Sequence, residues 1–493
     1  MVKKIKNIIR SKKFELFVLF IVLVGAFGVR LYKIQNPIAD WHSWRQVDTA
    51  SVSRIYVQNG IDLLKPRYYD ISVLQTGYQN TNGYRFVEFP IYNLIHVVLY
   101  QNFPQLDFVV WGRLVSVMAA MLTAGSLYYI GKNLFNKWIG LLSAFFYSFI
   151  PFNIYFTRVI LPDPLAVAFA VLSVCLFVEY VQKEKRLMLF ASAVSFSFAM
   201  LVKPTAFFYA VPITYLAVRK FGILGIFKNK SLLLSLDIAL IPVFLWRAWM
   251  NQKQYLVGIP YNQWLFNGDG IRFRPAYFRW IYGERLGRLI LGIWGLIPVS
   301  YGLFVVSKVK KYKYFSQAFL FGAFLFVTIF ATANVRHDYY QVFVVPPVAL
   351  ILGIGVYTYW QSAIGHKLLT RLFLIFSIGM MFLMGYDLVK GDYNINHYEI
   401  VTAGEAANKL LPKDAKVIAP YNGDTAFLYH TQRFGWPIVD RSIDEMIDLG
   451  ADYYVSVNTG DTDSVNFKKM FKTVEETGDY IILDLHERIE LEE

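Results

Sequence analysis

Apolar blocks of about 16 to 22 residues recur along this chain from residue 14 to about residue 388. A helix needs about 20 apolar residues to cross the hydrocarbon core of a bilayer, where its backbone satisfies its own hydrogen bonds. Of the 493 residues, 56% are hydrophobic and only 17% are charged, whereas a soluble domain carries about 25% charged residues. The pattern therefore predicts an α-helical polytopic membrane protein.

The apolar blocks give about eleven candidate transmembrane helices. They are residues 14–32, 109–130, 138–156, 164–181, 187–202, 204–218, 231–250, 288–307, 314–332, 340–359 and 371–389. The two spans on either side of Lys203 are short enough to form one broken hairpin, so the predicted number of spans is accurate to about one pair of spans. The first block resembles a signal peptide, but no small-residue cleavage site follows it, and it is interpreted as the first span.

Alternate connections between these spans are basic, and Lys and Arg in short loops mark the cytoplasmic side. The six basic connections are Lys3 to Lys13, Lys132 and Lys137, Lys183 to Arg186, Arg219 to Lys230, Lys308 to Lys313, and Lys367 and Arg371. The sequence thus predicts a cytoplasmic N-terminus and large outer loops at about 33–108 and 251–287. Residues 89–103 are predicted to lie flat at the outer interface as an amphipathic helix, because a crossing there would move every later basic loop outside.

The composition changes after about residue 392. Helical patterns alternate there with the strand-like runs KVIAPY, YYVSV and YIILDL. Residues 395–493 hold nineteen acidic and nine basic residues, a net charge of −10, although the whole chain carries +14. We therefore predict a transmembrane domain over 1–391 and a small extracytoplasmic α/β domain over 392–493.

The same residues argue against some classes of function. Because the basic residues lie in short loops and not in an aromatic-interleaved patch, no nucleic acid is expected as a partner. The sole cysteine, Cys175, lies in an apolar block and can form neither a disulfide framework nor a cysteine metal site within one chain. The positive net charge instead fits a membrane surface.

The first outer loop begins with a dense polar run. Asp40, His42, Arg45 and Asp48 fall within nine residues beside two tryptophans. The aspartates are candidates for a general base or for ligands of a divalent cation, and His42 and Arg45 are candidates for substrate binding. The alternative is an interfacial helix whose charges pair with one another. Glu88 is a further candidate carboxylate, although a helix start alone favours an acidic residue.

Two later segments carry charges at the predicted outer ends of spans. Arg158 and Asp163 flank the corner between the third and fourth spans, where a helix cap would explain Asp163 but not Arg158. Lys203 lies between two apolar runs on the side where lysine is disfavoured, so it is expected to meet an anion unless it snorkels to the surface.

The second outer loop is rich in arginine. Between residues 272 and 288 it holds no lysine and five arginines, namely Arg272, Arg274, Arg279, Arg285 and Arg288. Because the planar guanidinium suits phosphate oxygens, Arg272 and Arg274 are candidate phosphate ligands, with attraction to lipid headgroups as the alternative. In the run RHDYY before the tenth span, His337 and Tyr339 are candidates for the same role or for an aromatic girdle.

These clusters come from segments that lie far apart in the sequence, and the predicted topology places them on one membrane face. Unrelated polar residues would fall on either face at random. A transporter would place its polar groups near the bilayer midplane on broken helices, yet the candidate spans are nearly free of charge. The pattern favours a site at the outer ends of the helices.

In order and topology these residues resemble the GT-C glycosyltransferases, specifically the bacterial branch near the protein O-mannosyltransferases and the lipid A aminoarabinose transferase. The resemblance covers about residues 14–390 and is carried by Asp40 and the HSWRQVDTA run after it, EFP, the RxxLPDPL corner, Lys203-Pro204 and RHDYY. It implies a GT-C fold, a polyprenyl-phosphate sugar donor, an acceptor at the outer face and inversion at the anomeric carbon. The region from about residue 392 lies outside it.

The resemblance also implies roles for single residues. Asp40 matches the first-loop aspartate that acts as general base, and Asp163 matches the second acidic position. Many relatives have an Asp-Glu pair where this chain has Asp40-Trp41, so Asp48 stays a rival base.

The sequence therefore predicts an integral membrane glycosyltransferase that works at the outer face of the cytoplasmic membrane. It would transfer a hexosyl or pentosyl group from a polyprenyl phosphate to a lipid, glycan or protein acceptor. Lys203, Arg158 and the outer-loop arginines would stabilise the leaving phosphate, and a carboxylate would deprotonate the acceptor. The need for a divalent cation stays open. The alternatives are a transporter or flippase of polyprenyl-linked sugars and a non-catalytic scaffold.

Overall fold

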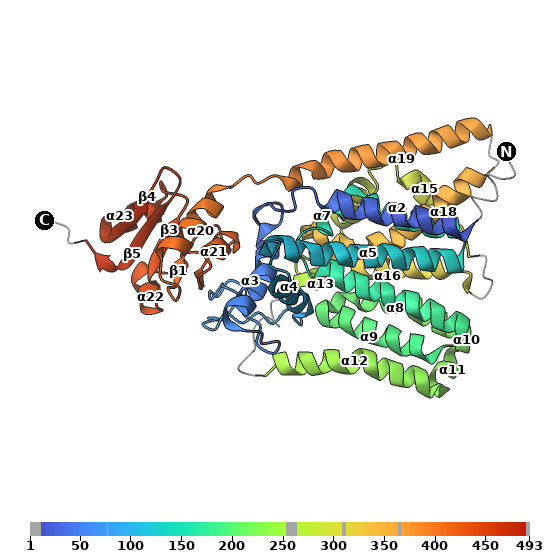
Figure 1. The fold of residues 1–493 in the computed structure, drawn as a ribbon, viewed down its shortest axis with the longest axis horizontal. Helices are drawn as coiled ribbons and strands as arrows, with labels where there is room; N and C mark the ends of the chain where they lie inside the picture. The colour runs from blue at the N-terminus through green and yellow to red at the C-terminus, as the bar shows by residue number, and fades with distance from the viewer. Residues whose placement is uncertain (1–10, 76, 253–263, 308–311, 363–365, 490–493) are drawn as a thin grey trace. The chain divides into compact units, whose positions relative to one another are not determined.

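The computed structural model describes residues 11–75, 77–252, 264–307, 312–362 and 366–489, and it is mostly helical (Figure 1). These residues fall into two compact units. The helical unit comprises the described residues of Met1–Ile34, Arg113–Trp249 and Asn262–Gly391, and the mixed unit comprises those of Gln35–Gly112, Met250–Tyr261 and Asp392–Glu493. The basic residues at 3–10 and 308–311 lie outside the described residues, as does part of the predicted outer loop 251–287.

The helical unit follows the predicted apolar blocks. Its first elements are α2 (Lys12–Arg30), most of α5 (Phe108–Leu134), α6 (Lys137–Phe149), α7 (Pro151–Phe156), α8 (Asp163–Lys183), α9 (Arg186–Val202), η1 (Pro204–Tyr209), α10 (Ala210–Phe221), α11 (Ile223–Lys228) and α12 (Lys230–Met250). Then come α13 (Trp264–Asn267), α14 (Pro275–Phe278), η4 (Arg279–Ile290), α15 (Leu296–Leu303), α16 (Phe315–Ile329), α17 (Ala331–Arg336), η6 (Asp338–Phe343), α18 (Val345–Gln361), α19 (Lys367–Val389) and η7 (Lys390–Tyr393).

Among the described residues, four helices are long and apolar enough to cross a membrane: α5, α8, α12, and α19 with its continuation to Tyr393. The helices α9 and α16 are apolar and shorter. The predicted α-helical membrane character is therefore confirmed, whereas the number of eleven spans stays a prediction.

Pro151 and a close backbone contact divide two of the predicted spans, and Pro204 lies at the predicted boundary between two others. Pro151 begins α7, and Pro204 begins the 3₁₀ turn η1, because proline donates no backbone hydrogen bond and disfavours a helical residue before it. The predicted span 288–307 is not one helix, since a turn at residues 291–295 separates η4 from α15. Gly292 has φ +47°, and a Cβ there would lie 2.3 Å from the carbonyl oxygen of Met381 on α19. Only glycine permits this approach.

Buried arginines hold the C-terminal end of α2. Arg30 is fully buried and donates to Thr157 Oγ1 at 2.8 Å. Arg158 and Arg113, also fully buried, both donate to the carbonyl of Lys33, at 2.7 and 3.3 Å. Because the last carbonyls of a helix lack intrahelical donors and carry partial negative charge, guanidinium groups satisfy them well.

The mixed unit contains helices and one sheet. Its helices include α3 (Ser43–Asn59), α4 (Ile91–Asn102), α20 (Glu399–Leu410), α21 (Ala426–Thr431), α22 (Ile443–Asp448) and α23 (Thr462–Met470). The strand order is β2-β1-β3-β5-β4, with β1 (Val417–Ile418), β2 (Gly435–Trp436), β3 (Tyr453–Ser456), β4 (Phe471–Glu476) and β5 (Ile481–Arg488). Strand β1 pairs in parallel with β2 and β3, whereas β5 pairs antiparallel with β3 and β4. The predicted small C-terminal α/β fold is confirmed.

Part of the first predicted outer loop joins this sheet. Asp70 forms a parallel bridge with Gly435, in which the N–H of Ile71 donates to the Gly435 carbonyl and the N–H of Gly435 donates to the Tyr69 carbonyl, both at 3.0 Å. Ile71 belongs to the same hydrophobic core as the fully buried Trp436. The mixed unit is thus built from segments at the two ends of the sequence.

The amphipathic helix predicted over residues 89–103 is present as α4. Its buried residues Tyr92, Asn93, His96 and Val97 lie four and three positions apart and so share one face. Its placement at a membrane interface stays a prediction.

The predicted topology can be tested with single cysteines in a Cys175→Ala background. Thr462→Cys, exposed at the start of α23, should react with a membrane-impermeant maleimide on intact cells. Lys228→Cys, in a predicted cytoplasmic loop, should react only after the membrane is opened. The reverse pattern would invert the topology.

Candidate functional site

Lys203 stands at the break between α9 and η1. Pro204 disfavours the helical conformation of the residue before it, and Lys203 has φ −151° and ψ 109°. Its side chain is buried, with Nζ 3.4 Å from Asp163 Oδ2 and 5.6 Å from the centre of the Tyr340 ring. The ammonium therefore lies beside a carboxylate and an aromatic face and does not snorkel to the surface.

Asp163 is the first residue of α8 and is fully buried. The helix cap considered from the sequence does not form: the N-cap position is Pro162, and no side chain caps the helix. Pro164 does occupy the first turn, as predicted. Asp163 Oδ1 is buried and has no hydrogen-bond partner among the described residues. A buried acceptor of this kind calls for a donor, such as a hydroxyl or a water.

Aromatic rings from the RHDYY run stack next to this pair. The rings of Tyr339 and Tyr340 lie 4.6 Å apart at 28°, and His337 stacks on Tyr339 at 5.5 Å. Tyr339 and Tyr340 belong to η6, which contacts α8. The helical unit thus brings together Asp163, Lys203 and the tyrosine pair from three separate segments.

The arginines predicted to bind phosphate differ in their surroundings. Arg158 is fully buried and donates to a backbone carbonyl just beyond α2. Arg272 donates to the carbonyls of Phe266 and Ile329 at 3.0 and 2.6 Å. Arg274 is exposed at the N-cap of α14. Arg158 and Arg272 hold backbone in place, and a phosphate role for any of the three stays a prediction.

Asp40 lies just before α3 in the mixed unit and is only 3% exposed. Gln46 Nε2 donates to Asp40 Oδ1 at 2.6 Å, and this amide orients the carboxylate while carrying no charge itself. His42 precedes α3 with a left-handed backbone, φ 56°, and its ring contacts Trp41 and Trp44 at centroid distances of 4.8 and 6.3 Å. Asp40 and His42 thus begin an ordered, largely buried polar segment.

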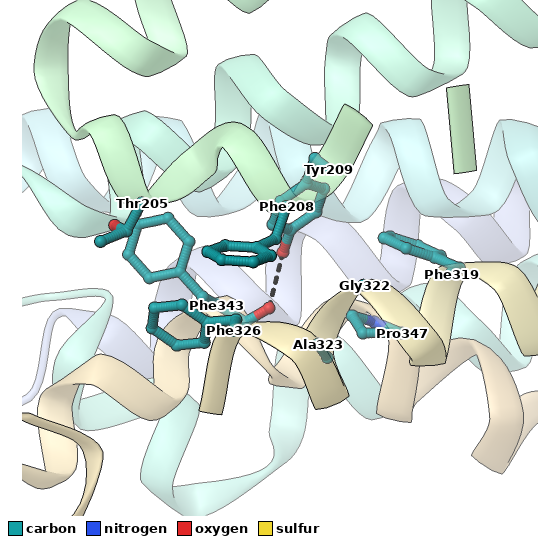
Figure 2. Close-up of a pocket in the computed structure, with 9 residues that line it drawn as sticks. All are labelled: Thr205, Phe208, Tyr209, Phe319, Gly322, Ala323, Phe326, Phe343 and Pro347. Carbon is teal, nitrogen blue, oxygen red and sulfur yellow. Dashed lines mark hydrogen bonds between the residues drawn. The ribbon is translucent and has the colours of Figure 1, made fainter. Parts of the chain in front are cut away.

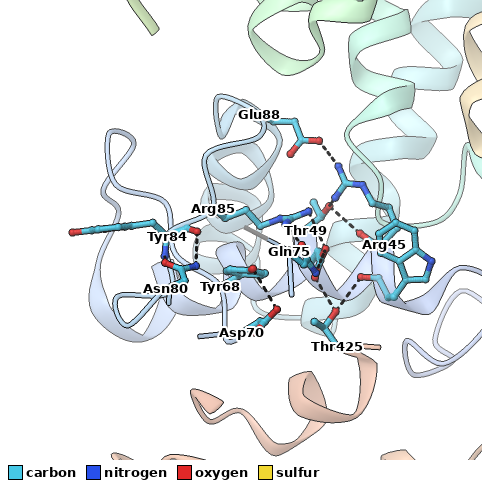
Figure 3. A network of polar contacts seen from close by, with 12 residues as sticks. Arg45, Thr49, Tyr68, Asp70, Gln75, Asn80, Tyr84, Arg85, Glu88 and Thr425 are labelled. Carbon is cyan, nitrogen blue, oxygen red and sulfur yellow. Dashed lines mark hydrogen bonds and ion pairs between the residues drawn. The ribbon is translucent and has the colours of Figure 1, made fainter. Parts of the chain in front are cut away.

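Asp48 lies on α3, and its carboxylate contacts Arg85, Gln75 and Thr425, which are labelled in the polar network of Figure 3. Arg85 forms an ion pair with Asp48 Oδ2 at 2.9 Å, and Gln75 lies 3.4 Å from the same oxygen. Thr425 Oγ1 donates to Asp48 Oδ1 at 2.8 Å. Because both oxygens are engaged, Asp48 is better suited to link α3 to the C-terminal segment of its unit than to accept a proton.

Arg45 and Glu88, two of the predicted site residues, form an ion pair (Figure 3). Arg45 also donates to Thr49 Oγ1 at 3.2 Å. The self-pairing of charges considered from the sequence thus holds for Arg45, whose guanidinium positions Glu88. Most of α3 is buried within the mixed unit, and its place at a membrane interface stays open.

Two other carboxylates of this unit hold protons more tightly than usual. Burial and the negative charge of Asp48 raise the pKa of Asp70 and of Asp424, and backbone N–H donors from Ser72 and Ala426 oppose this effect. The resulting pKa of each carboxyl is about 6. Below about pH 6 the acidic groups around Asp48 therefore carry less negative charge than their number suggests.

Several residues of these clusters were not predicted from the sequence. Tyr340 was part of a recognised run but was not singled out. Arg85 precedes Glu88 in YRFVEFP, where a charge among aromatic residues was an available signal. Thr425 lies in the C-terminal region, and no local pattern connects it to Asp48.

The divalent cation left open by the sequence finds little support in the geometry. Within the described ranges, no group of three or more His, Cys, Asp or Glu side chains is arranged to hold a metal ion. The carboxylates of Asp48 and Glu88 each accept from an arginine instead.

An aromatic cavity in the helical unit, shown in Figure 2, is a packing feature. Its volume is about 10 Å³, which at most admits a single water. The Tyr209 hydroxyl beside it is already used, since it donates to the carbonyl of Phe343 at 2.8 Å.

Comparison with known sequences gives one family. The family described as dolichyl-phosphate-mannose-protein mannosyltransferase matches residues 106–249, which include Arg158, Asp163 and Lys203. A comparison with curated proteins gives no match.

Solved structures give matches over nearly the whole chain. ArnT from Cupriavidus metallidurans bound to undecaprenyl phosphate matches with a TM-score of 0.68 and 11% identity, over 96% of this chain and 98% of that one. The archaeal oligosaccharyltransferase AglB from Archaeoglobus fulgidus, in complex with an inhibitory peptide and a dolichol-phosphate, matches with a TM-score of 0.56 and 11% identity, over 98% of this chain and 76% of that one. The resemblance to GT-C glycosyltransferases is thereby confirmed, and the glycosyltransferase class is supported by a sequence family as well as by the fold.

The raised pKa of Asp70 makes a prediction about stability. Its carboxyl is protonated below about pH 6 when folded but only below 3.8 when unfolded, so stability should fall as the pH rises between these values. Asp70→Asn keeps the acceptor for the Ser72 N–H and removes the ionisation, which corresponds to roughly 3 kcal/mol above pH 6. We expect a higher unfolding temperature than wild type at pH 8 and little difference at pH 4. The exposed control Asp479→Asn should follow wild type, and an Asp70→Asn variant that did the same would contradict the assignment.

Proposed function

We propose that this chain is an integral membrane glycosyltransferase that moves a sugar from a polyprenyl-phosphate carrier to an acceptor at the outer face of the cytoplasmic membrane. The observation that carries the proposal is the buried Lys203–Asp163 pair beside Tyr340, in a fold shared with ArnT, a protein crystallised with undecaprenyl phosphate. The acceptor is a lipid, a glycan or a protein.

The helical unit is proposed to hold the donor phosphate through Lys203. Lys203 Nζ is buried 3.4 Å from Asp163 Oδ2, so its charge is held at a fixed place among the helices. A phosphate oxygen brought to Nζ would accept a short charge-assisted hydrogen bond from it. The open acceptor of Asp163 then suits a hydroxyl of the bound sugar.

The proposed reaction breaks the bond between the anomeric carbon and the phosphate oxygen and forms a bond from the acceptor oxygen to that carbon. The electron pair of the broken bond stays on the polyprenyl phosphate. Its added negative charge is stabilised by Lys203, so no proton has to be given to the leaving group. Attack from the opposite side inverts the anomeric configuration.

Asp40 is proposed as the base, the role that the sequence predicts for it. It is buried and accepts from Gln46 Nε2. Both oxygens of Asp48 accept from Arg85 and Thr425, and Glu88 is paired with Arg45. When the acceptor is a hydroxyl, its proton passes to a carboxylate oxygen of Asp40. Glu88 and Asp48 act by positioning the segments around it.

Substitution of Lys203 tests the donor site. Lys203→Met keeps the length of the side chain and removes the charge, and binding of undecaprenyl phosphate should weaken about 10- to 100-fold, because hydrogen bonds to charged groups are worth about 1.5–3 kcal/mol. Lys203→Arg should recover part of the affinity. Binding is measured by titration on purified protein, with the exposed Lys390→Met as control. Equal affinity in Lys203→Met and wild type would remove Lys203 from the site.

Asp40 and Asp48 are distinguished by the kind of loss they produce. Asp40→Asn should lower turnover about 10²- to 10⁴-fold with unchanged folding and donor affinity, since only basicity is removed. Asp48→Asn should instead lower the unfolding temperature, because it removes the charge that Arg85 faces. Turnover is followed by mass spectrometry of the glycosylated envelope lipids, glycans and proteins of a complemented deletion strain. If Asp40→Asn formed product normally and Asp48→Asn were folded but inactive, Asp48 would be the base. Donor translocated without any new glycosidic bond would instead favour a transporter.

A further inference from the structure

A second cavity in the helical unit lies between α8, α9, α10, α11 and α12. Its volume is about 260 Å³, and its walls include Phe177, Leu189, Phe196, Ile213 and Leu236. Helix α12 forms one side and is largely exposed, since 28% of its apolar window is buried, compared with 72% for α8. The cavity is therefore an apolar groove beside an exposed apolar helix.

Three of the four hydroxyl groups around the groove have partners already, and the fourth, on Thr214, belongs to an exposed residue. Ser173 and Ser192 donate to each other's backbone carbonyl, both at 2.8 Å. Ser235 donates to the carbonyl of Leu232 at 2.7 Å. Because these groups are satisfied within the protein, the groove offers hydrocarbon surface and suits an alkyl chain better than a polar ligand.

One end of the groove is surrounded by basic helix ends. Leu189 in the wall lies three residues after Arg186, the first residue of α9, and Ile226 and Phe227 precede Lys228 at the end of α11. Lys230 begins α12, whose Leu232 and Leu233 also line the groove. Two acidic residues near this end are paired with other lysines, Glu179 with Lys183 and Glu184 with Lys220, and the exposed Asp237 lies seven positions after Lys230 on α12. This end therefore attracts an anion.

Helix α11 resembles a segment that lies in a membrane surface. Ile223, Leu224 and Phe227 are 67%, 74% and 69% exposed, yet Lys228 follows directly. A short helix with exposed apolar side chains next to lysines fits the boundary between acyl chains and headgroups. The groove therefore opens where a lipid would have its headgroup at the basic helix ends and its chain along the apolar wall.

We propose that this groove binds an anionic phospholipid, with one acyl chain between α12 and the α8–α9–α10 wall and the phosphate at Arg186, Lys228 and Lys230. The proposal goes beyond the transferase activity. It rests on the predicted topology only in placing the lipid in the cytoplasmic leaflet. Such a lipid would fill the groove beside α12.

The test uses full-length protein and native mass spectrometry with dioleoylphosphatidylglycerol or dioleoylphosphatidylcholine as probes. Wild type should retain the phosphatidylglycerol in preference. Each basic residue near an anionic lipid is worth about 1 kcal/mol, a factor of about five, so Lys228→Glu with Lys230→Glu should weaken retention roughly 25-fold or more. The matched control carries Lys409→Glu and Lys413→Glu, at exposed positions of the mixed unit, and should behave as wild type.

A variant in which a side chain fills the groove distinguishes the contribution of the acyl chain to lipid retention from that of the headgroup. Ala193→Trp, inside the groove, should reduce retention of both lipids alike, and the lysine variants decide the matter if this variant does not fold. Equal retention of the two lipids by wild type would overturn the proposal. Displacement of phosphatidylglycerol by undecaprenyl phosphate would overturn it as well, since it would assign the groove to the chain of the donor.

Discussion

A charge buried among apolar helices must be met by another charge or by hydrogen bonds, since removing it from water costs several kcal/mol. Several of the buried charges described above have such contacts at short distances. Arg30 and Arg158 donate to hydroxyl and carbonyl oxygens at 2.7 to 2.8 Å, and Arg85 lies 2.9 Å from Asp48. The Lys203–Asp163 pair is longer, at 3.4 Å. That spacing suits the proposed role of Lys203, in which an anionic substrate approaches the pair.

The sequence predicted the elements that depend on local pattern. Apolar length and basic loops marked the helices, and proline positions marked the corners at Asp163 and Lys203. Alternation of apolar residues marked three strands of the C-terminal sheet. The break in the predicted span 288–307 was not visible in this way, because it depends on how close Gly292 comes to Met381 on another helix.

The candidate site was predicted residue by residue but not contact by contact. Residue type and predicted side of the membrane singled out Asp40, Asp163 and Lys203. They did not separate Asp40 from Asp48, because the difference lies in Arg85 and Thr425, which come from other segments. In the same way, the residue type of Arg272 predicted a phosphate ligand. In the structure its guanidinium donates to backbone carbonyls. The sequence shows which charged residues are unusual for their position. The residues that they contact are determined by how the segments pack.

The bond between Thr425 and Asp48 joins residues 377 positions apart, and the bridge between Asp70 and Gly435 spans a similar separation. Contacts so distant in the chain form late, since the loop between them must close first. During synthesis Asp48 and Asp70 emerge early but lack these partners until residues 425 to 435 have been made. The ordering of both carboxylates therefore depends on a segment that is translated more than 350 residues later.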